Sequence, residues 1–373
     1  MRIGICAPYD LSLDGGVNSH IRAQARALRH LGHRVSVFGA ASSRPDEGEI
    51  AIAGATGIIV DGTESGVGLD PRAWMRVGRL LDRERFDVLH VHEPLMPIVP
   101  WCAVLRARVP IVGTFHAHRE RGHRFYPVYR PMLAPLLRRV AVRIAVAPAA
   151  RRTIARYFPG EYVILPNGID FARFRLPSAR PLDVAGDRRH VLYVGRIEPR
   201  KGLACLIDAM ATVQQRLPDV RLLVIGDGPG RDKAIARAHH ANVDAQFTGR
   251  VADHRLAAYY RAADVVCAPA TGGESFGLVL LEALAAGRAV VASRIEGYEE
   301  LVDEAGIVRF VPPADAQALA REITALMADP RARDTLGASG VAFAARFDWS
   351  AVARRLESIY YELLGSGCSS SII

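Results

Sequence analysis

Short apolar runs alternate with amphipathic helical stretches along nearly the whole chain, and this alternation occurs twice. Such a pattern is typical of parallel α/β sheets that helices cover on both faces. The first set of runs lies at 3–7, 35–38, 88–92, 111–116, 144–146 and 163–165, and the second at 191–194, 222–225, 246–248, 265–268 and 290–292. The sequence therefore predicts an α/β protein with two doubly wound parallel-sheet domains.

The two sets are separated by a stretch rich in proline and arginine that begins after Leu165 and shows little periodicity up to Arg189. We place an N-terminal domain at 1–170 and a C-terminal domain at 171–348. An apolar and aromatic helix is expected at about 349–364 and should pack back on the first domain. Residues 365–373 are expected to form a disordered tail.

Composition limits where the chain can work. It has 373 residues, 50% of them hydrophobic, without an apolar run of about 18 residues, which predicts a soluble chain with two cores. No signal peptide is apparent at the start. The five cysteines are scattered and form no C-x-x-C pair, which argues against disulfides and structural zinc. A cytoplasmic location is therefore expected.

The positive charge is concentrated in the first half. Residues 1–170 contain 23 arginines, no lysine and 15 acidic residues, a balance of +8, whereas the remainder has 25 basic and 24 acidic residues. An acidic partner is expected for the first half. Because none of the nucleic-acid-binding motifs is present, an anionic phospholipid membrane surface is favoured over nucleic acid.

The segment 272–287 holds two glutamates, Glu274 and Glu282, separated by seven residues. Glycines and Ser275 predict a loop, after which 278–286 forms a helix that ends at Gly287. Glu282 is the only charge of that helix, and a carboxylate among apolar residues needs a hydrogen-bond partner. Glu274 precedes free N–H groups that attract anions. Both features indicate a polyhydroxylated, phosphorylated ligand.

Lysine occurs only at Lys201 and Lys233, against 46 arginines. Arg196 is expected at the end of a strand and Lys201 at the start of a helix. This would place two cations where a pyrophosphate leaving group can lie. The alternative is a lysine on a solvated helix start.

The E-x7-E segment resembles the signature of retaining glycosyltransferases of family 4, which have the GT-B fold of two Rossmann-like domains with a cleft between them. The resemblance extends over nearly the full chain. Within the family, the chain's opening and the run His90-Val91-His92-Glu93-Pro94 resemble the actinobacterial phosphatidylinositol mannosyltransferases. The other matching motifs are Gly15-Gly16, Asn167-Gly168-Ile169-Asp170, Gly195-Arg196, Lys201-Gly202, Gly226-Asp227-Gly228-Pro229 and the terminal Phe-x-Trp helix.

This resemblance implies roles for individual residues. Glu274 would hold the donor sugar, Glu282 the ribose and Asp253 the base, with Arg196 and Lys201 on the leaving phosphate. The remaining donor-binding candidates are Gly15, Gly16, Gly195, Ser275, Phe276, Gly277 and Leu278. His116 would lie beside the transferred sugar, although a structural histidine is an equal alternative, and Tyr9, His116, Arg119 and Arg121 would contact the acceptor. Leu95 stands where the family pattern predicts a polar acceptor contact.

No cofactor and no metal are expected. The chain has no D-x-D motif, in agreement with metal-independent GT-B chemistry, in which protein cations and helix N-termini replace a divalent ion. His90, His92, His116 and His118 occur at strand spacing without a nearby cysteine or paired carboxylate, so a zinc site is not predicted.

A basic helix is expected after Asp70-Pro71, with Arg72, Arg76, Arg79 and Arg83 on one stripe. It is a candidate membrane-surface helix. The alternative is an ordinary solvated face in an arginine-rich protein.

The sequence thus predicts a peripheral enzyme at the inner face of the plasma membrane that moves mannose from GDP-mannose to phosphatidyl-myo-inositol. Alternatives that stay open are a UDP-sugar donor and a different acceptor, such as diacylglycerol, inositol phosphate or another small metabolite. A nucleotide-sugar epimerase with the same fold is the alternative from another class. The oligomeric state is not predicted.

Overall fold

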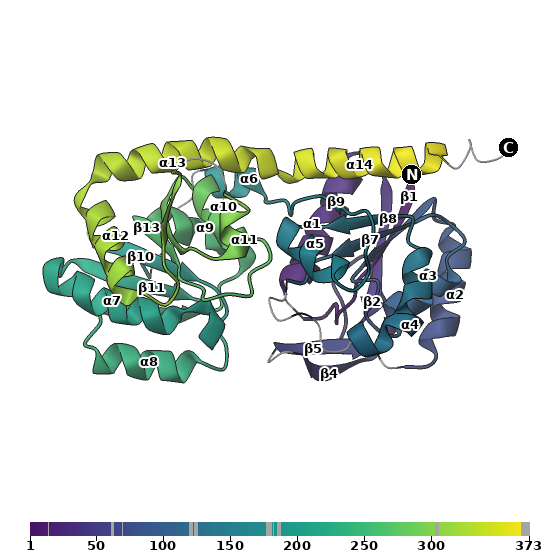
Figure 1. Cartoon of the computed structure of the whole chain (residues 1–373), viewed down its shortest axis with the longest axis horizontal. Helices are drawn as coiled ribbons and strands as arrows, with labels where there is room; N and C mark the ends of the chain where they lie inside the picture. The colour runs from purple at the N-terminus through teal and green to yellow at the C-terminus, as the bar shows by residue number, and fades with distance from the viewer. Residues whose placement is uncertain are drawn as a thin grey trace. The chain divides into compact units, whose positions relative to one another are not determined.

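The computed structural model describes residues 1–13, 15–60, 63–68, 70–118, 122, 126–176, 181, 183, 184, 188–302 and 306–366. The predicted acceptor contacts Arg119 and Arg121 and the tail from 367 onward lie outside these residues. The chain divides into two compact units (Figure 1). Unit 1 comprises Met1–Gly168 and the chain from Trp349 onward, and unit 2 comprises Ile169–Asp348.

Unit 1 is built on a seven-stranded parallel sheet. Its strand order is β3 (Glu49–Ala53), β2 (Arg34–Ala40), β1 (Arg2–Cys6), β6 (Val88–His92), β7 (Ile111–Phe115), β8 (Val142–Ala145) and β9 (Val163–Ile164). The six predicted strands are present. The edge strand β3 was not predicted, nor was an antiparallel hairpin of β4 (Ala55–Val60) and β5 (Thr63–Gly68).

Helices cover both faces of this sheet. The helices α2 (Ala73–Glu84), α3 (Val99–Arg106) and α4 (Tyr126–Arg138) pack on one face. The helices α1 (Gly16–His30) and α14 (Trp349–Ser366) pack on the other (Figure 1). There Leu356 and Tyr360 are buried in one cluster with Ile3 and Ile21. The chain's end therefore completes the core of unit 1. Since α14 continues to Ser366, residues 365 and 366 belong to this helix and not to a tail.

Unit 2 is built on a six-stranded parallel sheet. Its order is β12 (Ala245–Gly249), β11 (Val220–Ile225), β10 (Arg189–Val194), β13 (Val265–Ala268), β14 (Ala289–Ser293) and β15 (Val308–Val311), of which only β15 was not predicted. One core cluster joins the sheet to α7 (Leu203–Arg216), α8 (Arg231–His240) and α12 (Ala316–Ala328). The further helices of unit 2 are α6 (Phe171–Arg175), α9 (Asp253–Ala262), α10 (Leu278–Ala285), α11 (Glu296–Glu299) and α13 (Pro330–Ala344). One more helix, α5 (Pro148–Ala155), belongs to unit 1.

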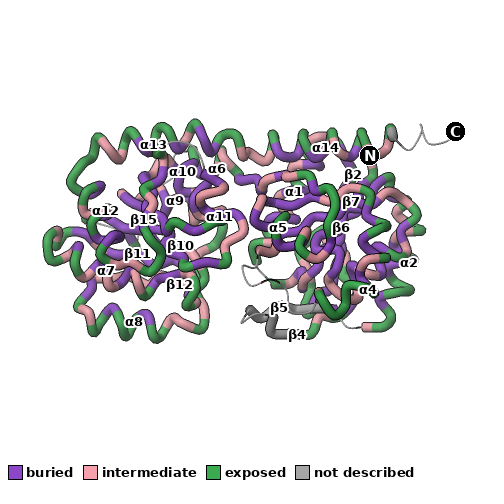
Figure 2. Tube along the Cα trace, in the orientation of Figure 1, coloured by how far each residue is buried: buried purple, intermediate pink, exposed green. Residues whose placement is uncertain are grey.

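In each sheet the chain first adds strands on one side of the first strand and then crosses over to add strands on its other side. The crossover lies between β1 and β6 in unit 1 and between β10 and β13 in unit 2. At such a switch point the loops after the two strands diverge and leave room for a ligand at the carboxyl ends. The central strands β1, β6, β7, β13 and β14 are almost continuously buried (Figure 2). Ligand chemistry is therefore expected in the loops after β1, β6, β10 and β13.

Among the described residues, no helix has both the length and the apolar character that a membrane span requires.

Candidate functional site

The loop after β10 is joined to the loop after β13. The backbone N–H of Thr271 donates to the carbonyl of Arg200 at 2.8 Å. Gly202, with φ of 72°, permits a close approach, since a Cβ there would lie 1.8 Å from the carbonyl oxygen of Pro269. The predicted helix start differs in detail: Lys201 ends a short 3-10 turn (Pro199–Lys201), and α7 begins at Leu203. Arg196 lies two residues beyond β10.

A charge cluster forms where these loops meet. One carboxylate oxygen of Glu274, Oε1, lies 2.7 Å from Nζ of Lys201 and 2.7 Å from Nη1 of Arg200. Arg200 also lies 2.7 Å from Glu198, which is 3.9 Å from Nε of Arg196. Three cations face two carboxylates, so the cluster has a surplus of positive charge. The side chain of Arg196 is 40% exposed, which leaves it accessible to an anion.

Arg200 and Glu198 were not predicted as site residues. They lie in the same run as Arg196 and Lys201, but the contact from Arg200 to Glu274 spans 74 positions of the chain. Local spacing holds no signal for a contact of that kind.

The loop 272–278 brings Glu274 to this cluster. Gly297, at the start of α11, leaves room for the carbonyl of Glu274, which would lie 1.9 Å from a Cβ at that position. Phe276 is buried and its ring packs on Phe347 at 6.1 Å. Gly277 precedes the first turn of α10. In this turn the N–H of Leu280 donates to the carbonyl of Gly277 at 2.9 Å, and among the described residues no side chain caps the start of the helix.

Glu282 of α10 has the partner that its apolar helix requires. The hydroxyl of Tyr260 donates to its Oε2 at 2.7 Å. Burial raises the pKa of Glu282 to about 7, the Tyr260 hydrogen bond and Arg173 act in the opposite direction, and Asp253 raises it further. Asp253 opens α9, so the predicted ribose and base residues influence one another electrostatically.

In unit 1 the end of β6 and the loops after β6 and β7 carry buried polar residues. His92 is fully buried, and its Nδ1 shares a hydrogen bond of 2.8 Å with Nε2 of His116. Glu93 accepts the backbone N–H of His116 at 2.6 Å and that of Ala117 at 3.1 Å. Burial, together with repulsion between the rings, lowers the pKa of His92 and His116 well below the ordinary value. Both rings are therefore neutral at pH 7.

Two further histidines lie beside this pair. His90 stacks on His92 with ring centroids 4.6 Å apart and bonds Thr114 and the hydroxyl of Tyr360 through its two nitrogens. His20, from α1, lies edge-on to His116 at 4.9 Å. The sequence provided no indication of His20, because the contact joins a helix to two strands.

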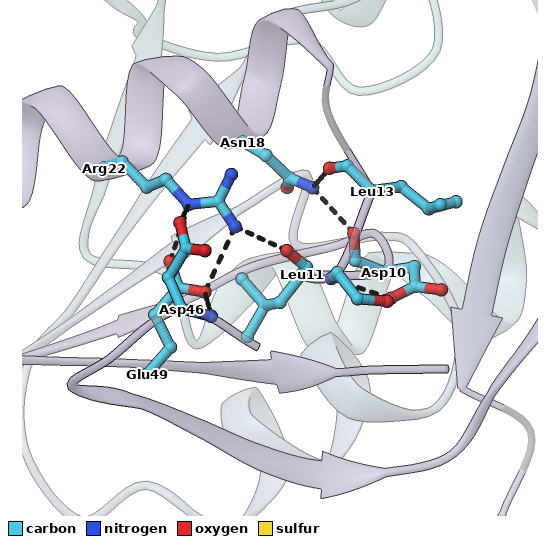
Figure 3. A network of polar contacts seen from close by, with 8 residues as sticks. Asp10, Leu11, Leu13, Asn18, Arg22, Asp46 and Glu49 are labelled. Atoms are coloured by element: carbon cyan, nitrogen blue, oxygen red, sulfur yellow. Dashed lines mark hydrogen bonds and ion pairs between the residues drawn. The ribbon is translucent and has the colours of Figure 1, made fainter. Parts of the chain in front are cut away.

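Of the predicted residues, Tyr9 lies in the loop after β1, Gly15 is the N-cap of α1 and Gly16 is the first residue of that helix. A Cβ at either glycine would meet nothing within 4 Å, so the start of α1 is open. A polar network holds the rest of the loop (Figure 3). Its members are Asn18, which donates to the carbonyls of Asp10 and Leu13, and Arg22, which donates to Leu11 and pairs with Asp46 and Glu49.

The basic helix forms as α2 (Ala73–Glu84) with Arg72 at its N-cap, and its four predicted arginines are exposed. Trp74, whose ring packs under the guanidinium of Arg106, is 42% exposed, and Met75 is 53% exposed. Leu95 is buried in the core of unit 1, which explains why it carries no polar acceptor contact.

Two family models match the chain. Glycosyltransferase Family 4 covers 14–173, and Glycosyl transferases group 1 covers 177–342. Each model thus matches the greater part of one unit.

Curated relatives are similar over the full length. A phosphatidyl-myo-inositol mannosyltransferase of Mycobacterium tuberculosis is 37% identical over 100% of both chains. One of Propionibacterium freudenreichii is 29% identical and covers 96% of this chain and 94% of that protein. A D-inositol 3-phosphate glycosyltransferase of Streptosporangium roseum is 31% identical, covering 93% and 88%.

Solved structures share the fold. A sucrose-phosphate synthase from Thermosynechococcus elongatus superposes with a TM-score of 0.78 at 24% identity, covering 98% of this chain and 99% of that one. A glycosyltransferase from Rickettsia africae has a TM-score of 0.77 at 17% identity, covering 97% and 98%.

Proposed function

The chain belongs to glycosyltransferase family 4 and is a hexosyltransferase with the GT-B fold, and from this premise we propose that it transfers mannose from GDP-mannose to phosphatidyl-myo-inositol with retention at the sugar. The observation that carries the proposal is the charge cluster of Arg196, Arg200, Lys201 and Glu274 at the switch point of unit 2. The mycobacterial relatives, at 37% identity, support the acceptor.

The cluster suits the departure of a nucleoside diphosphate. Glu274 is the counter-ion of Lys201 and Arg200, at 2.7 Å from each. A bound diphosphate replaces it in that role, because it is the stronger partner for both cations. Glu274 is then free to accept hydroxyl groups of the sugar. Fixed cations that meet the developing charge contribute about 3 kcal/mol each.

The acceptor side of the reaction fits unit 1. No enzyme nucleophile is proposed, so the acceptor hydroxyl attacks on the face that the phosphate leaves and passes its proton to that phosphate. A neutral His116 can orient the hydroxyl without repelling or neutralising the phosphate, and Tyr9 packs on the inositol ring. Proximity and fixed electrostatics then supply most of the rate enhancement.

The remaining donor contacts are proposed from α9 and α10. The carboxylate of Asp253 can accept N1–H and the amino group of guanine together, which favours GDP over UDP. Glu282 binds the ribose hydroxyls through the carboxylate oxygen that does not accept from Tyr260.

We place the enzyme at the inner face of the plasma membrane. The exposed arginines of α2 attract anionic headgroups, while Trp74 and Met75 enter the headgroup region. Arg119 and Arg121 are proposed to add to this attraction.

The proposal is tested with a matrix of GDP-mannose, UDP-glucose and other GDP- and UDP-sugars against phosphatidylinositol, phosphatidylglycerol, diacylglycerol and inositol phosphate, with product mass as the readout. We expect one mannosyl addition to phosphatidylinositol from GDP-mannose. Addition only to another lipid or from a UDP-sugar would contradict the proposal.

Two further arms resolve the alternatives. The Streptosporangium relative favours inositol phosphate as the second candidate acceptor, and addition to that compound alone would establish it. Donor incubated without acceptor should stay unchanged, since an epimerase would convert it. Transfer in EDTA should persist, because protein cations do the work of a divalent ion.

A further inference from the structure

Three histidines of unit 1 converge from separate elements. His20 comes from α1, His92 ends β6 and His116 follows β7, and one ring nitrogen from each lies within 4.8 Å of the others. The His20 ring meets His92 at 5.5 Å and His116 at 4.9 Å, both edge-on. From this convergence we propose that His20, His92 and His116 bind a divalent transition-metal ion, with zinc as the best match, and that the ion inhibits transfer.

The fold leaves a ligand atom unused in this cluster. Nδ1 of His92 is engaged with Nε2 of His116, but Nε2 of His92 has no hydrogen-bond partner among the described residues. His92 is 0% exposed. Buried polar atoms are nearly always paired, and a bound water or ion is a usual explanation for an exception. His20 is less free, because its Nε2 shares a hydrogen bond of 3.2 Å with the side-chain oxygen of Gln24 and the side chain of Asn167 also interacts with the ring.

The rings are in the protonation state that a metal needs. Burial lowers the pKa of His20 to about 4, and the pKa values of His92 and His116 fall well below the ordinary value. Each neutral ring carries one N–H and one lone pair. Three lone pairs can therefore face one ion without net proton release once the His92–His116 hydrogen bond opens.

The geometry requires a modest contraction. With Zn–N distances of ~2.0–2.1 Å, tetrahedral coordination places the nitrogens about 3.3 Å apart. The widest ligand pair, at up to 4.8 Å, must close to that distance. The His116 ring must also turn away from its 2.8 Å bond to Nδ1 of His92, so that its nitrogen faces the same ion as Nε2 of His92.

The donor set selects the kind of ion. Imidazole ligands suit zinc, copper and nickel, whereas magnesium and calcium prefer oxygen. A transition metal, and not magnesium, is thus expected to bind.

The claim that the bound ion inhibits sugar transfer rests on the proposed function. His116 is proposed to orient the acceptor hydroxyl, and a ring that ligates an ion is no longer free to do so. Binding of the ion itself does not depend on that proposal, and the two parts can be tested separately.

Binding is tested by calorimetric titration of zinc into the full chain, with cobalt absorption to identify nitrogen ligands. We expect one saturable site per chain and no response to magnesium. His20→Phe keeps the ring that packs on Trp349 at 4.9 Å but removes the ligand, and should weaken binding by about tenfold or more. The exposed pair His239→Ala and His240→Ala is the matched control and should leave the site unchanged.

Equal zinc binding by wild type and His20→Phe, or a cobalt spectrum with thiolate bands, would overturn the site. His92→Gln is a second ligand variant, and both variants are checked for folding by circular dichroism. If transfer from GDP-mannose is observed, zinc should inhibit the wild type and EDTA should restore it, while His20→Phe should stay active in zinc. Zinc that binds without slowing transfer would overturn the inhibitory part alone.

Discussion

The two units have the same kind of sheet, yet the groups at their switch points differ in kind. The loops after β10 and β13 carry Arg196, Arg200, Lys201 and Glu274, all charged and partly exposed. The loops after β6 and β7 carry histidines that burial keeps neutral. A shared fold thus places ligands at equivalent edges, while the side chains decide whether an edge suits a diphosphate or a hydroxyl group.

The largest effect on the proposed division between the units is expected when the Glu274 carboxylate is removed from the charge cluster of unit 2. Glu274→Ala deletes the sugar contact and frees Lys201 and Arg200 from their counter-ion, so we expect kcat/KM to fall by about 100- to 1,000-fold. Glu274→Gln keeps a hydroxyl acceptor and should lose less. Glu299→Ala, which removes an exposed glutamate paired with Arg294 at 2.7 Å, is the control. Unchanged transfer by Glu274→Ala would refute the assignment.

Lysine substitution tests the phosphate contact. Lys201→Ala should weaken binding of GDP-mannose by about 10- to 100-fold, because it removes one charged hydrogen bond of about 1.5–3 kcal/mol. The only other lysine, Lys233 on α8, is exposed and serves as the matched control. Titration calorimetry gives both dissociation constants. Superimposable curves for Lys201→Ala and wild type would contradict the role.

The raised pKa of Glu282 in unit 2 predicts that the free energy of unfolding depends on pH. Its pKa is about 7 in the folded chain, above the ordinary 4.5, so the folded state holds more protons and the free energy of unfolding falls as pH rises from about 4.5 to 7. Glu282→Gln keeps the Tyr260 bond without the charge. Between pH 5 and pH 8 the free energy of unfolding of Glu282→Gln should rise by about 2 kcal/mol relative to that of the wild type. This is less than the full pKa shift would give, because the residue is partly exposed.

Urea unfolding at the two pH values measures this gain. Glu322→Gln on α12 is the control and should show no such change. If the free energies of unfolding of Glu282→Gln and wild type differ by the same amount at both pH values, burial does not raise the pKa of the Glu282 carboxyl.

The smallest effect is expected on unit 1's exposed basic face. Arg79→Gln should reduce partition onto vesicles containing phosphatidylinositol by about fivefold, since each basic residue near an anionic surface contributes ~1 kcal/mol. Added salt should diminish the difference. Arg216→Gln on α7 of unit 2 is also an exposed arginine substitution and should have no effect. Equal losses in the two variants would remove α2 from the membrane contact.

The parts that the sequence predicted are those with a local signal. Buried strands such as β13 and β14 are short apolar runs, and α10 has helix formers between Gly277 and Gly287. The strands β3 and β15 were missed because only half of each is buried, and their mixed composition resembles a loop. Lys201 attracted attention through the rarity of lysine.

The parts that could not be predicted depend on contacts between distant segments. The bond from Arg200 to Glu274 spans 74 positions and that from Tyr260 to Glu282 spans 22. The histidine cluster needs α1, β6 and β7 to meet, and only the sheet order brings them together. Charge and hydrophobicity patterns predict elements, whereas such pairings require the folded geometry.

The central claim is that the charge cluster of unit 2 grips a sugar nucleotide by its diphosphate, and titration calorimetry with GDP-mannose, GDP and GMP tests it most directly. GDP-mannose and GDP should both bind, and GMP, which lacks the β-phosphate, should bind at least about tenfold more weakly because it loses contacts of 1.5–3 kcal/mol each. Binding of GMP as tight as that of GDP, or no heat with any of the three by folded protein, would contradict the account.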